Sequence, residues 1–98
     1  MNEEKLAEIN LLLYTNEDCF YCRQLSTTLA QITQERPHII VTKIAYNPQL
    51  HTSIKSTPSV IVQYNNDELG RFSSALSKKS LDSWLDQLQD YIRSHLSC

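Results

Sequence analysis

The sequence predicts a single α/β domain built around a four-stranded mixed sheet. Three observations indicate this fold class. The nearly continuous apolar run Ile9–Thr15 is typical of a strand that is covered on both faces. The spacing of apolar residues then changes to a helical period, and the last part of the chain carries a long amphipathic stripe. A strand, a helix and a second strand in this order favour a parallel pair with a right-handed crossover.

The first half of the chain is expected to hold two strands and the helix between them. The first strand follows a polar lead-in over residues 1–8 and is ended by turn-favouring residues at 16–18. A helix is expected from about Cys19 to Glu35, because apolar residues recur there at helical spacing and Pro37 stops it. The β-branched segment His38–Tyr46 predicts the second strand.

The second half is expected to form a hairpin and a final helix. The polar segment 47–56 predicts one or two helical turns, and Val60–Tyr64 predicts the third strand. A turn signal at 65–67 leads into a weaker edge strand over Leu69–Ser73. Ser77 is placed to cap the last helix. The predicted order is therefore β-α-β-α-β-β-α, in a four-stranded mixed sheet flanked by helices.

Composition limits the classes of partner. The 98 residues have 41% hydrophobic and 20% charged content and a formal charge of −2, which fits one domain over residues 1–98. That charge argues against a strongly basic nucleic-acid-binding surface, and the apolar runs are too short to span a bilayer. We therefore expect no nucleic-acid or membrane partner. The first eight residues lack a signal-peptide core, so a cytoplasmic location is expected. A single glycine, Gly70, excludes Gly-rich phosphate loops.

The motif Cys19-Phe20-Tyr21-Cys22 lies between the first strand and the start of the predicted helix. Backbone N–H groups and the helix dipole stabilise negative charge at that position, so they favour the reactive thiolate. A cysteine one turn further along the helix can reach the same sulfur. Cys19 is then the exposed attacking thiol and Cys22 the more buried resolving thiol. A strand, a CxxC pair and a helix within a βαβ unit indicate thiol–disulfide redox chemistry.

A second motif, Thr57-Pro58, lies at the entry of the third predicted strand. Proline cannot donate a hydrogen bond to the sheet. A cis bond before Pro58 would bend the chain and leave the Thr57 backbone free to pair with a bound peptide. A plain strand-entry turn is the alternative interpretation.

Together these motifs resemble the thioredoxin/glutaredoxin superfamily, over roughly residues 9–96 of the chain. Cys-Phe-Tyr-Cys is similar to the Cys-Pro-Tyr-Cys of glutaredoxins, with Phe20 in the proline position. Thr57-Pro58-Ser59, followed by VIVQY, is similar to the cis-proline segment of the family. The resemblance implies a thioredoxin-like fold that lacks the N-terminal β-α unit of full thioredoxins.

The resemblance also implies an activity and a set of roles. Cys19 would be the nucleophile, Cys22 the resolving thiol and Pro58 the cis-proline. From their place beside these residues, we expect Phe20, Tyr21 and Thr57 to contact the substrate. The implied activity is that of a protein-disulfide reductase, or of an oxidoreductase more generally. We expect the protein to act as a monomer, without a cofactor or metal. Disulfide-containing proteins would be its substrates, and a reductase or a low-molecular-weight thiol would recycle it.

The sequence also departs from the family pattern, and two other functions stay open. Thioredoxins place a buried acid six residues before the first cysteine, and that position is Leu13 here. A thioredoxin-like adaptor or redox-sensing module is therefore one alternative to an enzyme. A zinc-binding domain is another, because Cys19, Cys22, His95 and Cys98 form a CxxC…HxxC set of suitable ligand types.

Overall fold

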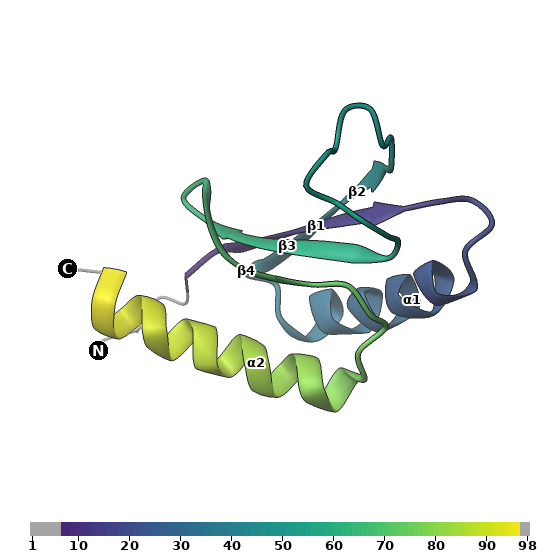
Figure 1. Cartoon of the computed structure of the whole chain (residues 1–98). Coiled ribbons are helices and arrows are strands. Elements are labelled where there is room, and N and C mark those ends of the chain that lie inside the picture. Colours follow the sequence, from purple (N-terminus) through teal and green to yellow (C-terminus); the bar gives the residue numbers. More distant parts are fainter. Residues whose placement is uncertain (1–6, 97–98) are drawn as a thin grey trace.

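A computed structural model describes residues 7–96 and shows one α/β unit (Figure 1). Four strands and two α-helices follow one another in the order that the sequence predicts for them. No helix in the described residues is both long and apolar enough to cross a membrane. The elements are β1 Ile9–Thr15, α1 Phe20–Glu35, β2 Ile39–Ala45, β3 Ser59–Tyr64, β4 Asp67–Phe72, α2 Lys78–Tyr91 and a closing π-helical turn, η1, Ile92–Leu96.

The sheet is mixed, as predicted, with the strand order β2-β1-β3-β4. β1 and β2 are parallel and are connected through α1, whereas β1 and β3 are antiparallel. β3 and β4 form a hairpin whose turn residues Asn65 and Asn66 have φ values of 54° and 69°. Asparagine tolerates this left-handed region better than most residues, so the Asn-Asn pair suits a tight hairpin turn.

Both helices pack on one face of the sheet (Figure 1). Ile9, Leu11 and Leu13, alternate residues of β1, point to this face and are at most 1% exposed. The opposite face has no helix over it within residues 7–96 and carries a smaller cluster in which Tyr14 and Ile61 pack with Ile54. The predicted flanking helices are therefore found on a single side.

The expectation of helical turns between residues 47 and 56 is corrected, because this segment forms turns without a helix. The Asn47 carbonyl accepts from the N–H groups of both Leu50 and His51, at 3.0 and 2.8 Å. The Asn47 side chain accepts from the N–H of Gln49 at 2.9 Å, and the Asn47 N–H donates to the His51 ring. Asparagine satisfies the local backbone in this way and stops the turn from propagating.

Arg36, the residue after α1, ties the two helices together. Its guanidinium lies 3.1 Å from the Asp82 carboxylate and 3.0 Å from the Asp86 carboxylate, both on α2. Lys78 also donates to Asp82, at 2.9 Å. The Lys78 hydrogen bond and the Arg36 contact outweigh the effect of burial and hold the pKa of Asp82 below its ordinary value. This network fixes the end of α1 that lies opposite the CxxC pair.

Candidate functional site

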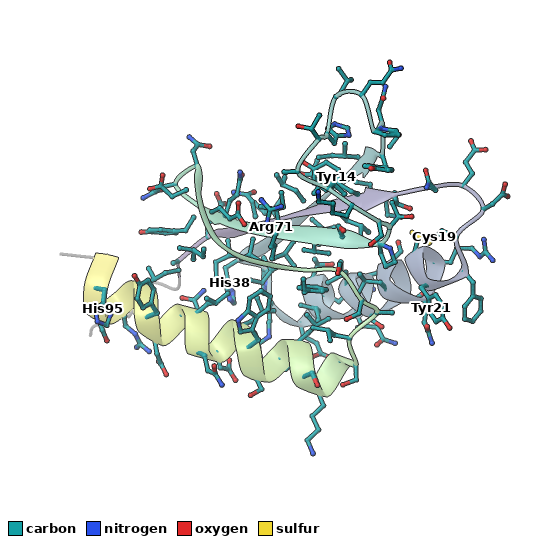
Figure 2. The ribbon with its side chains drawn as sticks, in the orientation of Figure 1. Tyr14, Cys19, Tyr21, His38, Arg71 and His95 are labelled. Carbon is teal, nitrogen blue, oxygen red and sulfur yellow. A yellow bond between two sulfur atoms is a disulfide. The ribbon has the colours of Figure 1, made fainter. Side chains whose placement is uncertain are left out.

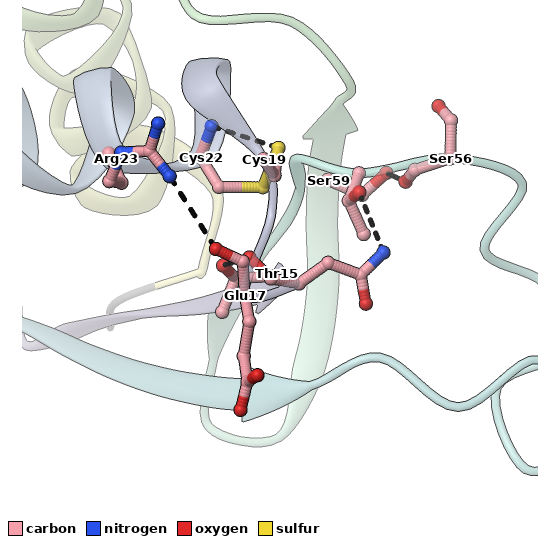
Figure 3. Close-up of a disulfide and its surroundings, with 9 residues drawn as sticks. Thr15, Glu17, Cys19, Cys22, Arg23, Ser56 and Ser59 are labelled. Atoms are coloured by element: carbon pink, nitrogen blue, oxygen red, sulfur yellow. Dashed lines mark hydrogen bonds between the residues drawn. A yellow bond between two sulfur atoms is a disulfide. The ribbon is translucent and has the colours of Figure 1, made fainter.

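Cys19 is the N-cap residue of α1 and follows the exposed loop 16–18 that leaves β1. Its backbone is extended, with φ −116° and ψ 107°, and its Sγ accepts the N–H of Cys22 at 3.0 Å (Figure 3). An N-cap side chain normally satisfies one of the unpaired N–H groups of the first helical turn. Here a sulfur takes that place, so the same N–H is aimed at the atom that carries charge in a Cys19 thiolate.

Cys19 and Cys22 form a disulfide with their Cα atoms 5.1 Å apart (Figure 3). The two sulfurs lie in different surroundings. Cys22 is 2% exposed and belongs to the buried face of α1, whereas Cys19 is partly open to solvent. An attacking group from outside can therefore approach the pair on the Cys19 side, whereas Cys22 is shielded.

The Thr57–Pro58 segment borders the disulfide. Its peptide bond is cis, and Pro58 is buried where the chain enters β3. The side-chain amide of Asn16 donates to Thr57 Oγ1 at 3.2 Å, so the loop before Cys19 is tied to this segment. An open cavity of about 720 Å³ lies between them and is lined by Asn16, Glu17, Asp18, Cys19, Phe20, Tyr21 and Thr57.

Two aromatic side chains stand out from the surface between the cysteines. Phe20 is 62% and Tyr21 60% exposed, and their rings meet edge to face with centroids 5.3 Å apart. Tyr21 also lines a second cavity of about 380 Å³, which continues along Thr57 and Pro58 to the stretch before α2. Of the four residues expected to contact substrate, Phe20, Tyr21 and Thr57 therefore line the cavity beside Cys19, and Pro58 lines the adjoining one.

A further cavity, of about 350 Å³, lies on the Cys22 side of the disulfide. Sequence reasoning did not find it, because its residues come from separate elements. The lining residues are Thr15, Cys22, Arg23, Ser26, Thr27 and Lys43. It contains two basic side chains, three hydroxyls and no carboxylate. Leu13, at the position of the family's buried acid, is 0% exposed and lies opposite Lys43 in the β1–β2 register.

The residues of the zinc alternative are not brought together. His95 lies at the far end of the molecule from Cys19 (Figure 2), where its ring stacks on Tyr91. Cys98, the fourth candidate ligand, falls outside the described residues. Within residues 7–96 there is no group of three His, Cys, Asp or Glu side chains that could hold a metal ion.

A mixed four-stranded sheet that presents a CxxC disulfide at a helix N-terminus, next to a cis-proline, is the arrangement of thioredoxin-like proteins. The structure confirms the thioredoxin-like fold that the resemblance implies. The fold also matches solved structures of thioredoxins. Chlamydomonas reinhardtii thioredoxin f2 aligns with a TM-score of 0.74 at 20% identity, over 89% of this chain and 84% of that one. A point mutant of a thioredoxin from Halobacterium salinarum aligns with a TM-score of 0.73 at 14% identity, over 85% and 76% of the two chains. At these identities the alignments establish the fold.

Sequence comparison gives a curated relative, thioredoxin C-3 of Corynebacterium nephridii. The two sequences are 31% identical over 75 residues, which cover 72% of this chain. The match spans about half, 52%, of the relative's own length. No family model matches the chain.

Proposed function

We propose that this chain is a thiol–disulfide oxidoreductase that uses Cys19 and Cys22 to reduce disulfides in polypeptides. The observation that carries the proposal is the asymmetry of the pair: a partly exposed sulfur at a helix N-cap is bonded to a buried one. Resemblance to thioredoxins in fold and in sequence supports the same activity.

The reaction consists of two thiol–disulfide exchanges. The Cys19 thiolate attacks one sulfur of the substrate disulfide, forms a mixed disulfide and expels the other substrate sulfur as a thiolate. The Cys22 thiolate then attacks Cys19 Sγ, which restores the Cys19–Cys22 disulfide and releases the second substrate thiolate. Both expelled thiolates take protons from water. The substrate gains two electrons and the protein loses two, which an external thiol or a reductase must return.

The residues around Cys19 suit a substrate chain in extended form. We take the Thr57 backbone, which precedes the cis Pro58 and lines a cavity there, to pair with the chain on one side of the substrate cysteine. Phe20 and Tyr21 offer apolar area beside the reacting sulfurs. We take the protein to act as a monomer in the cytoplasm, as the sequence predicts.

The test is turnover of a model disulfide together with capture of the intermediate. In a Cys98→Ser background, the protein should reduce insulin catalytically with dithiothreitol as the electron source. Cys22→Ser should accumulate a covalent adduct with the substrate, because the resolving step is removed. Cys19→Ser should form no adduct at that position and should show no turnover. Intact-mass measurement under non-reducing conditions detects the adduct, and its absence in Cys22→Ser would contradict the mechanism.

The redox-sensing alternative is favoured by one feature, the buried Leu13. With an apolar side chain there, the described residues place no carboxylate in the cavity beside Cys22 to accept its proton. A sensor would react once with an oxidant and recover slowly. The number of insulin disulfides reduced per protein molecule separates the two functions, since an enzyme gives many and a sensor gives about one.

A further inference from the structure

The cavities on the two sides of the disulfide are lined by charged side chains of opposite sign. Glu17 and Asp18 line the open cavity on the Cys19 side, and both are exposed. Arg23 and Lys43 line the other cavity, on the Cys22 side. Arg23 donates to the main-chain oxygen of Glu17, at 3.5 Å, so this contact leaves the Glu17 carboxylate unused.

Most acidic side chains of the described residues take part in ion pairs, but those of Glu17 and Asp18 do not. Within residues 7–96, neither of the two lies within ion-pair distance of a basic side chain. The paired acids are Glu35, Glu68, Asp82, Asp86 and Asp90. The cavity beside Cys19 thus carries two carboxylates without an ion-pair partner in the described residues, and none of its lining residues is basic.

The same cavity contains the exposed rings of Phe20 and Tyr21. Aromatic faces attract ammonium and guanidinium groups, and carboxylates at the rim attract them at longer range. An incoming disulfide must bring one sulfur to Cys19 Sγ, so the residues that flank its cysteine enter this cavity. Basic side chains would find both kinds of partner there, whereas acidic ones would meet two like charges.

We propose that this site selects polypeptide disulfides whose cysteines are flanked by lysine or arginine, and that Glu17 and Asp18 set this selection. The inference rests on the proposed function and names its substrate class. It also implies that anionic disulfides are poor substrates, because the same two carboxylates repel them during the approach to Cys19.

The test uses three disulfide-linked peptides of equal length with blocked ends, in which lysine, glutamine or glutamate flanks the cysteine. The readout is kcat/KM for each peptide, with dithiothreitol as the electron source, at low ionic strength and again in 0.5 M NaCl. The quantity of interest is the lysine-to-glutamate ratio of kcat/KM in the wild type, divided by the ratio in a Glu17→Gln/Asp18→Asn variant. This division removes the different intrinsic reactivities of the peptides.

We expect a quotient of about ten at low ionic strength, since electrostatic steering by a surface of one sign raises association rates by about tenfold or more. In 0.5 M NaCl the quotient should fall toward one, because the screening length is then only about 4 Å. The matched control is Glu8→Gln/Asp67→Asn, which changes the net charge equally. Both control residues are exposed. Glu8 immediately precedes β1 and Asp67 begins β4, so they lie at the end of the sheet opposite the disulfide.

The outcomes separate this inference from the proposed function. If no peptide is reduced, both are overturned. If all peptides are reduced but the quotient is one at low salt, the selection by charge is refuted and the oxidoreductase activity stands. If the control pair lowers the ratio as much as the Glu17/Asp18 pair does, net charge is responsible and the assignment to these two residues is refuted.

Discussion

Gln89 attaches the chain segment before β1 to α2, and its replacement gives a prediction with a definite magnitude. The side chain is 6% exposed and makes two hydrogen bonds to one residue. The N–H of Ala7 donates to Gln89 Oε1 at 3.0 Å, and Gln89 Nε2 donates to the Ala7 carbonyl at 2.8 Å. Both backbone groups are partly buried, so they lose these partners if the amide is removed.

The perturbation is Gln89→Met, which keeps the length of the side chain and removes both hydrogen bonds. Each bond contributes about 1 kcal/mol net, so the free energy of unfolding should fall by about 2 kcal/mol. For a domain of this size, that corresponds to a decrease in Tm of about 10 °C. Urea unfolding followed by far-UV circular dichroism measures the change, with the Cys19–Cys22 disulfide kept oxidised.

Gln87→Met is the matched control, because Gln87 is an exposed residue on the same helix. The same chemical change there should alter the free energy of unfolding by at most about 0.5 kcal/mol. If Gln89→Met is also within that range of the wild type, the two bonds to Ala7 contribute nothing measurable, and our account of how β1 is attached is wrong.

Two further predictions concern stability. Among residues 7–96, the buried Nε2 of His38 has no hydrogen-bond partner. Desolvation together with the charge of Arg36 lowers the pKa of this ring below its usual 6.5. The unfolded chain therefore binds a proton at His38 more readily than the folded chain does. The stability that His38 contributes is complete above about pH 6.5 and declines as the pH falls through the lowered pKa. In His38→Gln this decline should disappear from urea midpoints measured between pH 7.5 and 5, and an unchanged pH profile would show that His38 does not cause it. A Cβ added at Gly70 would lie 3.0 Å from Trp84 Cζ2, on a ring held edge to face against Phe72. Gly70→Ala should therefore cost about 1 kcal/mol, and a double-mutant cycle with Trp84→Leu should recover most of it, whereas purely additive effects would rule out the contact as the cause.

The local elements of this protein follow from its sequence. The run Ile9–Thr15 and β1 have the same bounds, and α1 begins directly after its cap Cys19, close to where the sequence predicts the start of the helix. These features depend on side chains close together in the chain, where apolar period and capping chemistry act directly. The proximity of the two sulfurs was predictable for the same reason, because a separation of three residues at the start of a helix brings Cys19 and Cys22 to the same face of that helix. The segment 47–56 is the local failure, because the side-chain bonds of Asn47 outcompete a helix there.

The distribution of charge about the disulfide could be decided only by the tertiary structure. Glu17 and Asp18 precede Cys19, but the sequence does not show that they share a cavity with Thr57, a residue far along the chain. Nor does it show that Arg23 and Lys43, from α1 and β2, meet on the opposite side next to Cys22. The β1–β2 register and the packing of α1 on one face of the sheet place these groups. Residue types and spacing therefore determined the reactive pair, whereas long-range packing determined the surface that a substrate meets, because that surface is assembled from segments that only the folded sheet holds together.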